Sequence, residues 1–406
     1  MKNKQSMLGL AVASAFVMAG CATSLEGPVA KSTASRPQLS ESQAAGHTLA
    51  AYFAKAGNIE ALKSDPWDPA AKGIGDVSTF KPAFTVAADG SGTHKTVQQA
   101  LDAVAAKGGT DRIYVLVKPG VYREQVCLKD TAPVTIYSTS TDASKVVIVN
   151  NKANASSKPK DETLNACEGR KGADSYGTSG SSTFLAYTDG FEAKNLTISN
   201  DYDESVSPKG AQAVALNTRG DKVILENVRL LGNQDTLMMK SSSVGEVDRA
   251  YVTNSYIEGD VDFVFSRAVA VFDKVEFKSL TRKNAEGGYV FAPSHPQNYP
   301  YGFLVINSKF TSDGSKNISL GRAWDDSGGV YKAADGKSFV PNGMLVIRNS
   351  WIGDHIDAQS PWDKAASTNR PFNSEKAQTV KFGKADVEFP ANRLFEYRNS
   401  GPGAAK

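Results

Sequence analysis

The stretch ILENVRL at residues 224–230 recurs along this chain of 406 residues as YVTNSYI at 251–257, LVINSKF at 304–310 and VIRNSWI at 346–352. Each copy sets one asparagine between apolar residues, which is the pattern of a short strand that turns a corner. A looser copy is FEAKNLTI, and VFDKVEF carries lysine instead of asparagine. The aligned positions are 195, 227, 254, 274, 307 and 349, on average about 31 residues apart, which is a spacing typical of repeat architectures.

The repeat predicts an all-β solenoid. Short strands at this period, without crossover helices between them, do not form a doubly wound sheet. They can stack as rungs of a parallel β-helix. The repeated asparagine is then expected at one corner of successive rungs, where its amide satisfies backbone groups and its backbone tolerates the left-handed conformation. The uneven spacing indicates loop insertions on one side, where a substrate groove is usually built.

The region before the repeats predicts how the solenoid begins. The run FTVAADGSGTHKTVQQALDAV reads as a strand, a Gly-rich turn and a short capping helix with Val97, Leu101 and Val104 on one face. Residues 21–80 are rich in Ala, Ser, Lys and Pro, and we interpret them as a tether and lead-in segment. Within them, residues 47–62 are compatible with a short helix. The β-helix domain is predicted to cover residues 81–406.

Composition limits the classes of function. Hydrophobic residues make up 40% of the chain and charged residues 22%, which is normal for a globular protein with a real core. Forty-six basic residues against forty-three acidic ones give a formal net charge of +3. Such a small and dispersed charge excludes a typical nucleic-acid binder. A mildly basic surface still suits an acidic polymer as partner.

The N-terminus carries the pattern of an export signal. Lys2 and Lys4 precede an uncharged stretch at residues 7–20, which is too short to span a bilayer. The small residues before Cys21 resemble the lipobox of bacterial lipoproteins, which implies a signal peptide at residues 1–20 and lipidation of Cys21. Ala22 after the cysteine resembles the class sorted to the outer membrane. We therefore expect an outer-membrane lipoprotein of the cell envelope, with its catalytic domain in the periplasm and the lipid as its only membrane contact.

The spacing of the other cysteines and of the histidines does not indicate a metal site. Cys127 and Cys167 are compatible with one disulfide in an oxidising compartment, or with two buried thiols, and the sequence does not decide between them. There is no C-x-x-C motif. The histidines lack the spacing of metal ligands; they are His47, His94, His295 and His355. No metal or other cofactor is predicted.

Five motifs in order point to one family. They are GVYREQV at residues 120–126, QAVAL at 212–216, GNQDTL at 232–237, GDVDFVF at 259–265 and LGRAW at 320–324. Together they resemble the pectin methylesterases from about residue 83 to the C-terminus, and the run after Ala83 resembles the first segment of that family. The resemblance implies a single-stranded right-handed parallel β-helix of the pectin-lyase-like type. It also implies hydrolysis of galacturonate methyl esters without a cofactor.

The resemblance assigns roles that the chemistry of ester hydrolysis requires. Asp262 would be the nucleophile, because a carboxylate is ionised at neutral pH and needs no base to activate it. Arg322 would hold that carboxylate by a forked pair of hydrogen bonds. Asp235 would be the general acid and then the general base. Gln212 and Gln234 would donate amide N–H groups to the tetrahedral oxyanion.

The same resemblance places substrate-binding residues and shows departures from the family. Trp324 and Phe265 would pack against pyranose faces. Met238 and Asn217 occupy two further subsite positions with residue types that are unusual there, and Ala323 stands where a proline is usual. The long segment MMKSSSVGEVDRA and the lipid anchor resemble an enterobacterial lipoprotein branch of the family.

Other catalytic systems fit less well. Asp326 and Ser327 superficially resemble part of a serine-protease motif, but no partner histidine segment accompanies them, and there is no G-x-S-x-G elbow. A lyase would need an acidic calcium cluster, and a glycosidase would need several close carboxylates. The leading hypothesis is a monomeric esterase acting on pectin or methylated oligogalacturonides. An esterase or thioesterase for another acyl group is second, and a non-catalytic polysaccharide-binding β-helix is third.

Asp260 lies beside the predicted nucleophile. If GDVDF is a strand, residues 260 and 262 project to one face about 7 Å apart. The second negative charge would then disfavour ionisation of Asp262. The alternative is that Asp260 is solvated or paired with a nearby Lys or Arg and leaves catalysis unchanged.

Overall fold

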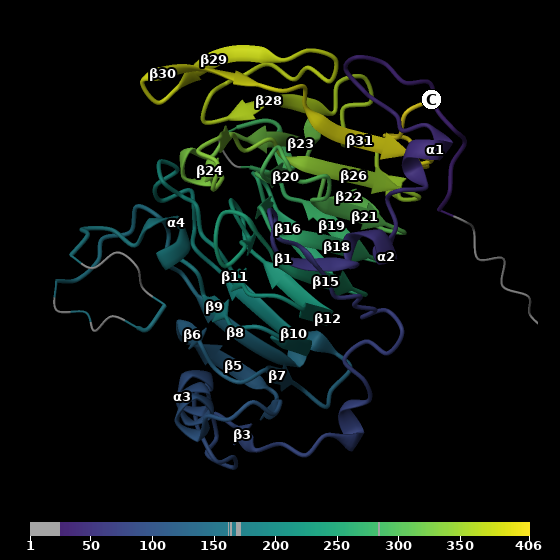
Figure 1. The fold of residues 1–406 in the computed structure, drawn as a ribbon. Coiled ribbons are helices and arrows are strands. Elements are labelled where there is room, and N and C mark those ends of the chain that lie inside the picture. Colours follow the sequence, from purple (N-terminus) through teal and green to yellow (C-terminus); the bar gives the residue numbers. More distant parts are fainter. Residues whose placement is uncertain (1–24, 161, 163–164, 168–171, 283–284) are drawn as a thin grey trace, which may run out of the picture.

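The computed structural model describes residues 25–160, 162, 165–167, 172–282 and 285–406, and its strands coil into a parallel β-helix (Figure 1). The coil has three long faces. The first face contains β3 Phe84–Val86, β4 Ile113–Val117, β7 Val134–Tyr137, β10 Glu192–Asn200, β12 Val223–Leu231, β15 Arg249–Thr253, β18 Val269–Asp273, β21 Phe303–Ile306, β26 Met344–Arg348 and β31 Arg393–Tyr397.

The second face shares β10 and β12 with the first, and the third face is a separate sheet. The second adds β5 Gly120–Arg123, β8 Val146–Asn150, β16 Tyr256–Gly259, β19 Glu276–Ser279, β22 Lys309–Ser312 and β27 Trp351–Ile352. The third consists of β6 Val126–Lys129, β9 Phe184–Tyr187, β11 Leu216–Arg219, β13 Leu237–Met239, β17 Val264–Ser266, β20 Gly288–Pro293, β23 Ile318–Trp324 and β28 Trp362–Ala366. The predicted β-helix is confirmed.

The repeated asparagines form the corner between the first and second faces. All six aligned positions have positive φ; the values are 62° at Asn195, 51° at Asn227, 48° at Asn254, 58° at Lys274, 51° at Asn307 and 51° at Asn349. Asn227 donates to Asn195 Oδ1 at 2.8 Å and to Thr141 O at 2.9 Å, and Asn195 donates to Ser138 O at 3.0 Å. The side-chain amides therefore donate to backbone carbonyl groups at the corner, and the expected left-handed conformation is confirmed.

The core lies inside the coil, because alternate residues of every strand point inward. On the first face, in-register pairing stacks apolar side chains from rung to rung, each no more than 2% exposed. One such column is Val115, Ile136, Ala193, Leu225, Val252, Phe272, Val305 and Ile347.

Helix α3 (Val97–Lys107) covers the N-terminal end of this core. Thr96 and Gln99 form a capping box, and Val97, Leu101 and Val104 are buried, as the sequence predicts. The other helices are single turns: α1 Glu41–Ala44, α2 Leu49–Tyr52 and α4 Gly177–Gly180, with 3₁₀ turns at η1 Val77–Thr79, η2 Ala143–Lys145 and η3 Ser327–Gly329. Within the described part of the chain, no helix is long and apolar enough to cross a membrane.

The described part of the expected tether is instead packed on the first face. The side chains of Tyr52 and Phe53 are at most 1% exposed and belong to a cluster with Val271 and Leu304. The helix considered for residues 47–62 ends at Tyr52, because the chain then enters β1 Lys55–Asn58, which pairs with β2 Lys63–Ser64 and with β14 Glu246–Val247. Hydrophobic contacts and strand pairing thus hold a segment whose composition resembles a linker.

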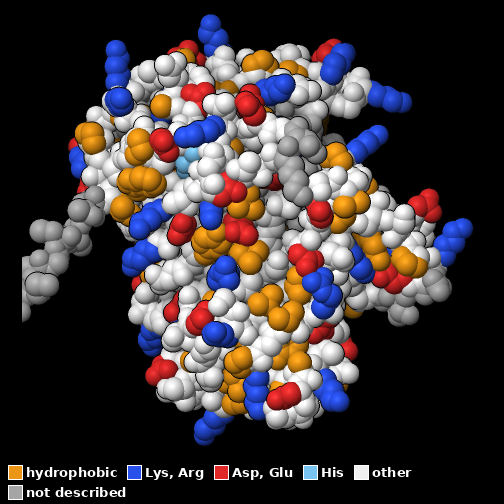
Figure 2. All heavy atoms as spheres, turned by 180° about the vertical axis from the view of Figure 1, so that it is seen from behind, with side chains coloured by type: hydrophobic (Ala, Val, Ile, Leu, Met, Phe, Trp, Pro, Cys, Tyr) orange, Lys and Arg blue, Asp and Glu red, His pale blue; other side chains and the backbone are white. Residues whose placement is uncertain are grey.

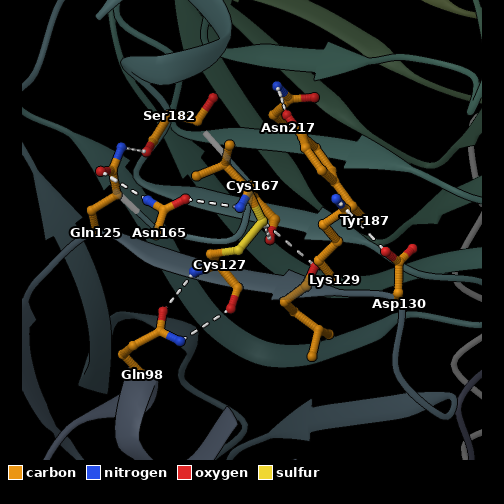
Figure 3. Close-up of a disulfide and its surroundings, with 12 residues drawn as sticks. Gln98, Gln125, Cys127, Lys129, Asp130, Asn165, Cys167, Ser182, Tyr187 and Asn217 are labelled. Atoms are coloured by element: carbon orange, nitrogen blue, oxygen red, sulfur yellow. Dashed lines mark hydrogen bonds and ion pairs between the residues drawn. A yellow bond between two sulfur atoms is a disulfide. The ribbon is translucent and has the colours of Figure 1, made fainter. Parts of the chain in front are cut away.

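A disulfide joins Cys127 of β6 to Cys167, so the first of the two alternatives for these cysteines is the one observed (Figure 3). Gln98 of α3 accepts from Cys127 N at 2.7 Å and donates to Cys127 O at 3.1 Å. The bridge thus fastens the loop that projects beside α4 in Figure 1 to the capping end of the β-helix.

Two further hairpins lie outside the three faces. They are β24 Tyr331–Lys332 with β25 Ser338–Phe339, and β29 Gln378–Phe382 with β30 Ala385–Phe389. On the surface shown in Figure 2, Lys and Arg are interspersed with Asp and Glu and form no single basic face.

Candidate active site

Three consecutive turns bring the predicted catalytic residues together on the third face. Gln212, Gln234 with Asp235, and Asp262 come just before β11, β13 and β17. The N–H of Ala213 donates to Gln234 O at 3.0 Å, and the N–H of Asp235 donates to Val261 O at 3.0 Å. These bonds stack the turns in register about 4.8 Å apart. Residues far apart in the sequence therefore lie side by side.

Arg322 of β23 holds Asp262 in a forked pair of hydrogen bonds. Its Nε donates to Oδ1 at 3.0 Å and its Nη2 donates to Oδ2 at 2.8 Å. The side chains of Asp262 and Arg322 are 12% and 18% exposed. Burial lowers the pKa of Arg322, but the hydrogen bonds to Asp262 and the negative charge of Asp262 raise that pKa by more, so the net shift is upward. The pair fixes an ionised carboxylate in one orientation.

Asp235 has the opposite electrostatic environment. The residue is 7% exposed. Its pKa is raised well above the ordinary value, first by burial and then by the Asp262 charge, with Arg322 opposing the shift and Asp260 adding to it. A carboxylic acid in this environment keeps its proton to a higher pH than an ordinary carboxyl group does.

Asp235 and Asp262 both have an unusual backbone conformation. Asp235 has φ of 68° and Asp262 has φ of 49°, in the left-handed region that non-glycine residues seldom occupy. Such conformations cost free energy and persist where the surrounding structure enforces them, often at functional sites. Asparagine also tolerates this region, so an Asp→Asn change removes the charge with little added strain.

A hydrogen bond fixes the side-chain amide of Gln212, whereas that of Gln234 makes none with the described residues. Gln212 Oε1 accepts from Asn154 Nδ2 at 3.0 Å, and this fixes the amide so that its nitrogen is free to donate. Among the described residues, neither Gln212 Nε2 nor Gln234 Nε2 has a hydrogen-bond partner. Two N–H donors on neighbouring rungs are thus left for an oxygen atom that arrives with substrate.

Tyr289, Asp363 and Asn154 support this group and were missed by sequence reasoning. The ring of Tyr289 lies under the guanidinium of Arg322, and its hydroxyl donates to Asp363 Oδ2 at 2.7 Å. No motif contains these residues. Only the alternation of β20, which turns Tyr289 outward from the core, offers a signal in the sequence.

The four residues predicted to bind substrate lie on strands of the third face: Asn217 on β11, Met238 on β13, Phe265 on β17 and Trp324 on β23. Phe265 and Met238 pair in register, each 3% exposed, and Trp324 is partly exposed with its ring centre 5.7 Å from that of Phe265. Asn217 is fully buried and donates to the Tyr187 hydroxyl at 2.9 Å. Trp324 is therefore the one of the four with appreciable exposed surface. Met238 and Phe265 form the buried surface against which it packs, and Asn217 is buried on the neighbouring strand.

Comparison with known proteins decides the family. A sequence profile of the family described as Pectinesterase matches residues 83–369. The chain belongs to the pectinesterase family. A pectinesterase from Ralstonia solanacearum is 42% identical over 92% of this chain and 93% of its own length.

Two solved structures extend this similarity to the fold. Escherichia coli YbhC, named provisionally as an acyl-CoA thioester hydrolase, aligns with a TM-score of 0.76 and 31% identity over 91% of this chain and 96% of its own. A pectin methylesterase in complex with a hexasaccharide aligns with a TM-score of 0.63 and 27% identity over 80% of this chain and 91% of its own. The family makes this chain a carboxylic ester hydrolase.

Of the two alternatives for Asp260 at this pectinesterase site, the one that required a strand does not hold. Residues 260–262 are not a strand, because β16 ends at Gly259 and β17 begins at Val264. Asp260 therefore does not share a strand face with Asp262. It is 1% exposed, and its Oδ2 lies 3.5 Å from Arg282 Nε. The alternative, pairing with an arginine, is the observed arrangement.

Within the described residues there is no group of three or more His, Cys, Asp or Glu side chains that could hold a metal ion. His295 is buried; its Nε2 donates to Ala268 O at 3.0 Å, and its Nδ1 accepts from Met344 N at 3.3 Å.

Proposed function

We propose that this enzyme hydrolyses the methyl esters of galacturonate units in pectin or methylated oligogalacturonides and releases methanol. One observation carries the proposal: two neighbouring carboxylates have opposite environments, Asp262 being held by Arg322 and Asp235 being buried with a raised pKa. Such a pair supplies a nucleophile and a proton donor at the same pH. The saccharide complex of a related pectin methylesterase supports a carbohydrate substrate.

In the first half-reaction, an Oδ of Asp262 attacks the ester carbonyl carbon. The negative charge that forms on the carbonyl oxygen is stabilised by the amide N–H groups of Gln212 and Gln234. Asp235 gives its proton to the methoxy oxygen as the carbon–oxygen bond breaks, and methanol leaves. The galacturonyl group is then joined to Asp262 as an anhydride.

In the second half-reaction, Asp235 is ionised and accepts a proton from water. The resulting hydroxide attacks the galacturonyl carbonyl, and the same two glutamines stabilise the second oxyanion. Asp262 leaves as a carboxylate, which Arg322 again holds in place. The product is a galacturonic acid unit, which releases its proton to solvent to become galacturonate, and Asp235 has regained its own proton.

The experiment is methanol release from a methyl-esterified oligogalacturonide. Asp262→Asn should abolish turnover and Asp235→Asn should reduce it severely, while both variants keep the wild-type melting temperature. Gln212→Ala and Gln234→Ala should each lose about 10²-fold in kcat. A folded Asp262→Asn enzyme that retains a tenth of the wild-type rate would exclude Asp262 as the nucleophile.

One comparison favours a second candidate. YbhC, provisionally a thioester hydrolase, is 32% identical over 98% of this chain. The same carboxylate pair can cleave a thioester, because a thiolate leaves without protonation. Turnover of an acyl-CoA with no methanol release from pectin would replace the first function by the second.

The proposal extends to the location of the enzyme. Residues 1–20 as signal peptide and Cys21 as the lipidated residue lie outside the described residues, and the sequence pattern alone supports an outer-membrane lipoprotein facing the periplasm as a monomer. Gly27 N donates to Arg398 O at 2.8 Å, so the packed chain begins beside the last rung. The six residues from Cys21 to Gly27 span at most about 22 Å, so the C-terminal end of the β-helix would lie near the membrane.

The anchor is tested by metabolic labelling with palmitate. The wild-type protein should incorporate label and fractionate with membranes. Cys21→Ser should do neither, and the purified catalytic part should keep its rate. Label in the Cys21→Ser protein would refute lipidation at this residue.

A further inference from the structure

A groove of about 690 Å³ lies along the asparagine corner, where the first and second faces meet. Its lining includes the corner residues Asn254 and Lys274 and side chains from β12, β16, β19 and β22, which are middle rungs of the coil (Figure 1). Asn254 and Asp262 lie at opposite ends of β16, and none of the proposed catalytic residues lines the groove. The groove is therefore separate from the candidate active site.

Lys274 interrupts the row of corner asparagines in the middle of this groove. Its φ of 58° lies in the left-handed region, which asparagine adopts more readily than lysine because the short amide side chain can hydrogen-bond locally. On the next rung Asn307 donates to Asp273 Oδ1 at 2.9 Å, whereas the Lys274 ammonium makes no hydrogen bond or ion pair with the described residues. Lysine therefore costs stability at this position and makes no visible contact in return, which points to a function outside the fold.

Two more cations of the groove have no carboxylate partner. Arg229 of β12 and Lys309 of β22 make no side-chain hydrogen bond or ion pair within the part of the chain that the structure describes. Cζ of Arg229 lies 5.6 Å from the ring centre of Tyr256. In-register pairing places Arg229, Tyr256, Glu276 and Lys309 on successive rungs, about 4.8 Å apart. The cations are thus spread along the length of the groove.

The acidic side chains of the groove are already engaged. Glu276 Oε1 accepts from Thr311 Oγ1 at 2.8 Å, and Asp142 Oδ1 accepts from Ser144 N at 3.0 Å. Asp142 Oδ2 also lies 3.9 Å from Lys145 Nζ. Three cations and two carboxylates line the groove. The cations are the groups left without partners, so the charge of the groove favours an anion.

The uncharged groups of the groove suit a sugar better than a lipid surface. Tyr256 is partly exposed, and an aromatic ring can pack against the apolar face of a pyranose. The exposed amide of Asn254 makes no hydrogen bond with the described residues, so it can donate to and accept from hydroxyl groups. The large hydrophobic side chains that are exposed in the described residues all lie outside the groove. A sugar acid carries both the hydroxyl groups and the carboxylate that such a groove can bind.

We propose that Arg229, Lys274 and Lys309 bind the free galacturonate units of an acidic polysaccharide at a second, non-catalytic site. The carboxylates of the polymer pair with the three cations, and its hydroxyl groups bond to the Asn254 amide. The choice of galacturonate rests on the function proposed above, which brings this polymer to the enzyme. The site keeps the polymer on the enzyme while the catalytic turns, at the other end of the second face, act on it.

The first test is binding of unesterified polygalacturonate to the full chain, measured by calorimetry. Lys274→Asn should weaken binding about fivefold, because a charge-assisted hydrogen bond is lost at an exposed position. Its melting temperature should equal or exceed that of the wild type, because asparagine suits the left-handed corner. A loss of affinity without a loss of stability is a result that a merely structural role of Lys274 does not give.

The matched variants show whether the loss belongs to the groove. Lys309→Gln should weaken binding about as much as Lys274→Asn. Lys107→Gln removes the same charge from an exposed position at the end of α3 and should bind as the wild type. Equal affinities of all three variants would overturn the site.

The second test separates the groove from the active site and from a membrane contact. Lys274→Asn should raise KM for long, partly methylated pectin much more than KM for a short methylated oligomer that fills only the active site. Equal increases for the two substrates would place the effect at the active site and reject the groove. A loss of binding to vesicles of anionic phospholipid, with unchanged binding to polygalacturonate, would reject the saccharide in favour of a lipid surface.

The fate of this site is independent of the fate of the proposed function. A wild-type enzyme that releases no methanol would refute the function, and the affinities for polygalacturonate would still decide the groove. Normal methanol release, with Lys274→Asn and Lys107→Gln binding polygalacturonate equally, would reject the groove and leave the function intact.

Discussion

The Tyr289 ring centre lies 3.8 Å from Cζ of Arg322, the residue that holds Asp262 by two hydrogen bonds. Tyr289 belongs to β20, which pairs with β17 on one side and β23 on the other. Asp262 directly precedes β17, and Arg322 lies on β23. The Tyr289 hydroxyl donates to Asp363, so the ring itself is fixed. The orientation of Asp262, the proposed nucleophile, therefore depends on Tyr289 and Asp363 as well as on Arg322.

This stacking predicts a loss of kcat when the ring is removed. Tyr289→Leu should lower kcat about tenfold, because a partly desolvated cation–π contact contributes about 1 to 2 kcal/mol and Arg322 would lose its support. KM should change much less. Tyr289→Phe keeps the ring and loses only the bond to Asp363, so it is the matched control and should stay within about threefold of wild type. Equal losses in both variants would show that the hydroxyl, and not the ring, matters.

The sequence predicts the parts of this molecule that depend on local pattern. Asn195 and Asn227 repeat at a fixed place because every rung needs the same left-handed corner, so their role can be derived before the fold is known. Tyr289 and Asn154 cannot be found in that way, since each acts on a partner that only the coiling of rungs brings near. The sequence left open whether GDVDF is a strand, because its alternation of apolar and acidic residues imitates one although the chain bends at Asp260.

The raised pKa of Asp235 predicts an alkaline limit to activity. The first half-reaction needs Asp235 protonated, so the rate of acylation should fall as the pH rises through that pKa, and the limb should lie well above the usual range of a carboxyl group. The pre-steady-state release of alcohol is the quantity to measure. A p-nitrophenyl ester needs no proton for its leaving group, so its burst should lack this limb. A limb that is the same for both esters would remove Asp235 as the general acid.

Arg249 predicts how firmly the N-terminal segment is held. Its side chain is fully buried and bonds to Asp65 and Asp221, each at 2.6 Å, and to Phe53 O at 3.1 Å. Arg249→Met should lower the free energy of unfolding by about 3 kcal/mol, because carboxylates and a carbonyl would lose their partner. Limited proteolysis should then cut near Asp65.

The control for Arg249 is an exposed ion pair of equal length. Arg123 and Asp201 are 2.6 Å apart with side chains 55% and 44% exposed. Arg123→Met should cost no more than about 1 kcal/mol. Similar urea midpoints for the two variants would mean that the segment contributes little to the stability of the β-helix.

The environment of Asp260 predicts that its removal leaves the acidic limb of activity unchanged, in contrast to the shift expected if residues 260 and 262 shared a strand face. Burial and the hydrogen-bonded carboxyl of Glu204 raise its pKa to about 8, against the charge of Arg282. Below that pH Asp260 is mostly neutral, and asparagine closely imitates a protonated aspartic acid. Asp260→Asn should therefore give a profile of kcat/KM between pH 4 and pH 7 that superimposes on that of the wild type. An acidic limb displaced to lower pH in Asp260→Asn would show that Asp260 carries its charge in this range and acts on the catalytic carboxylates.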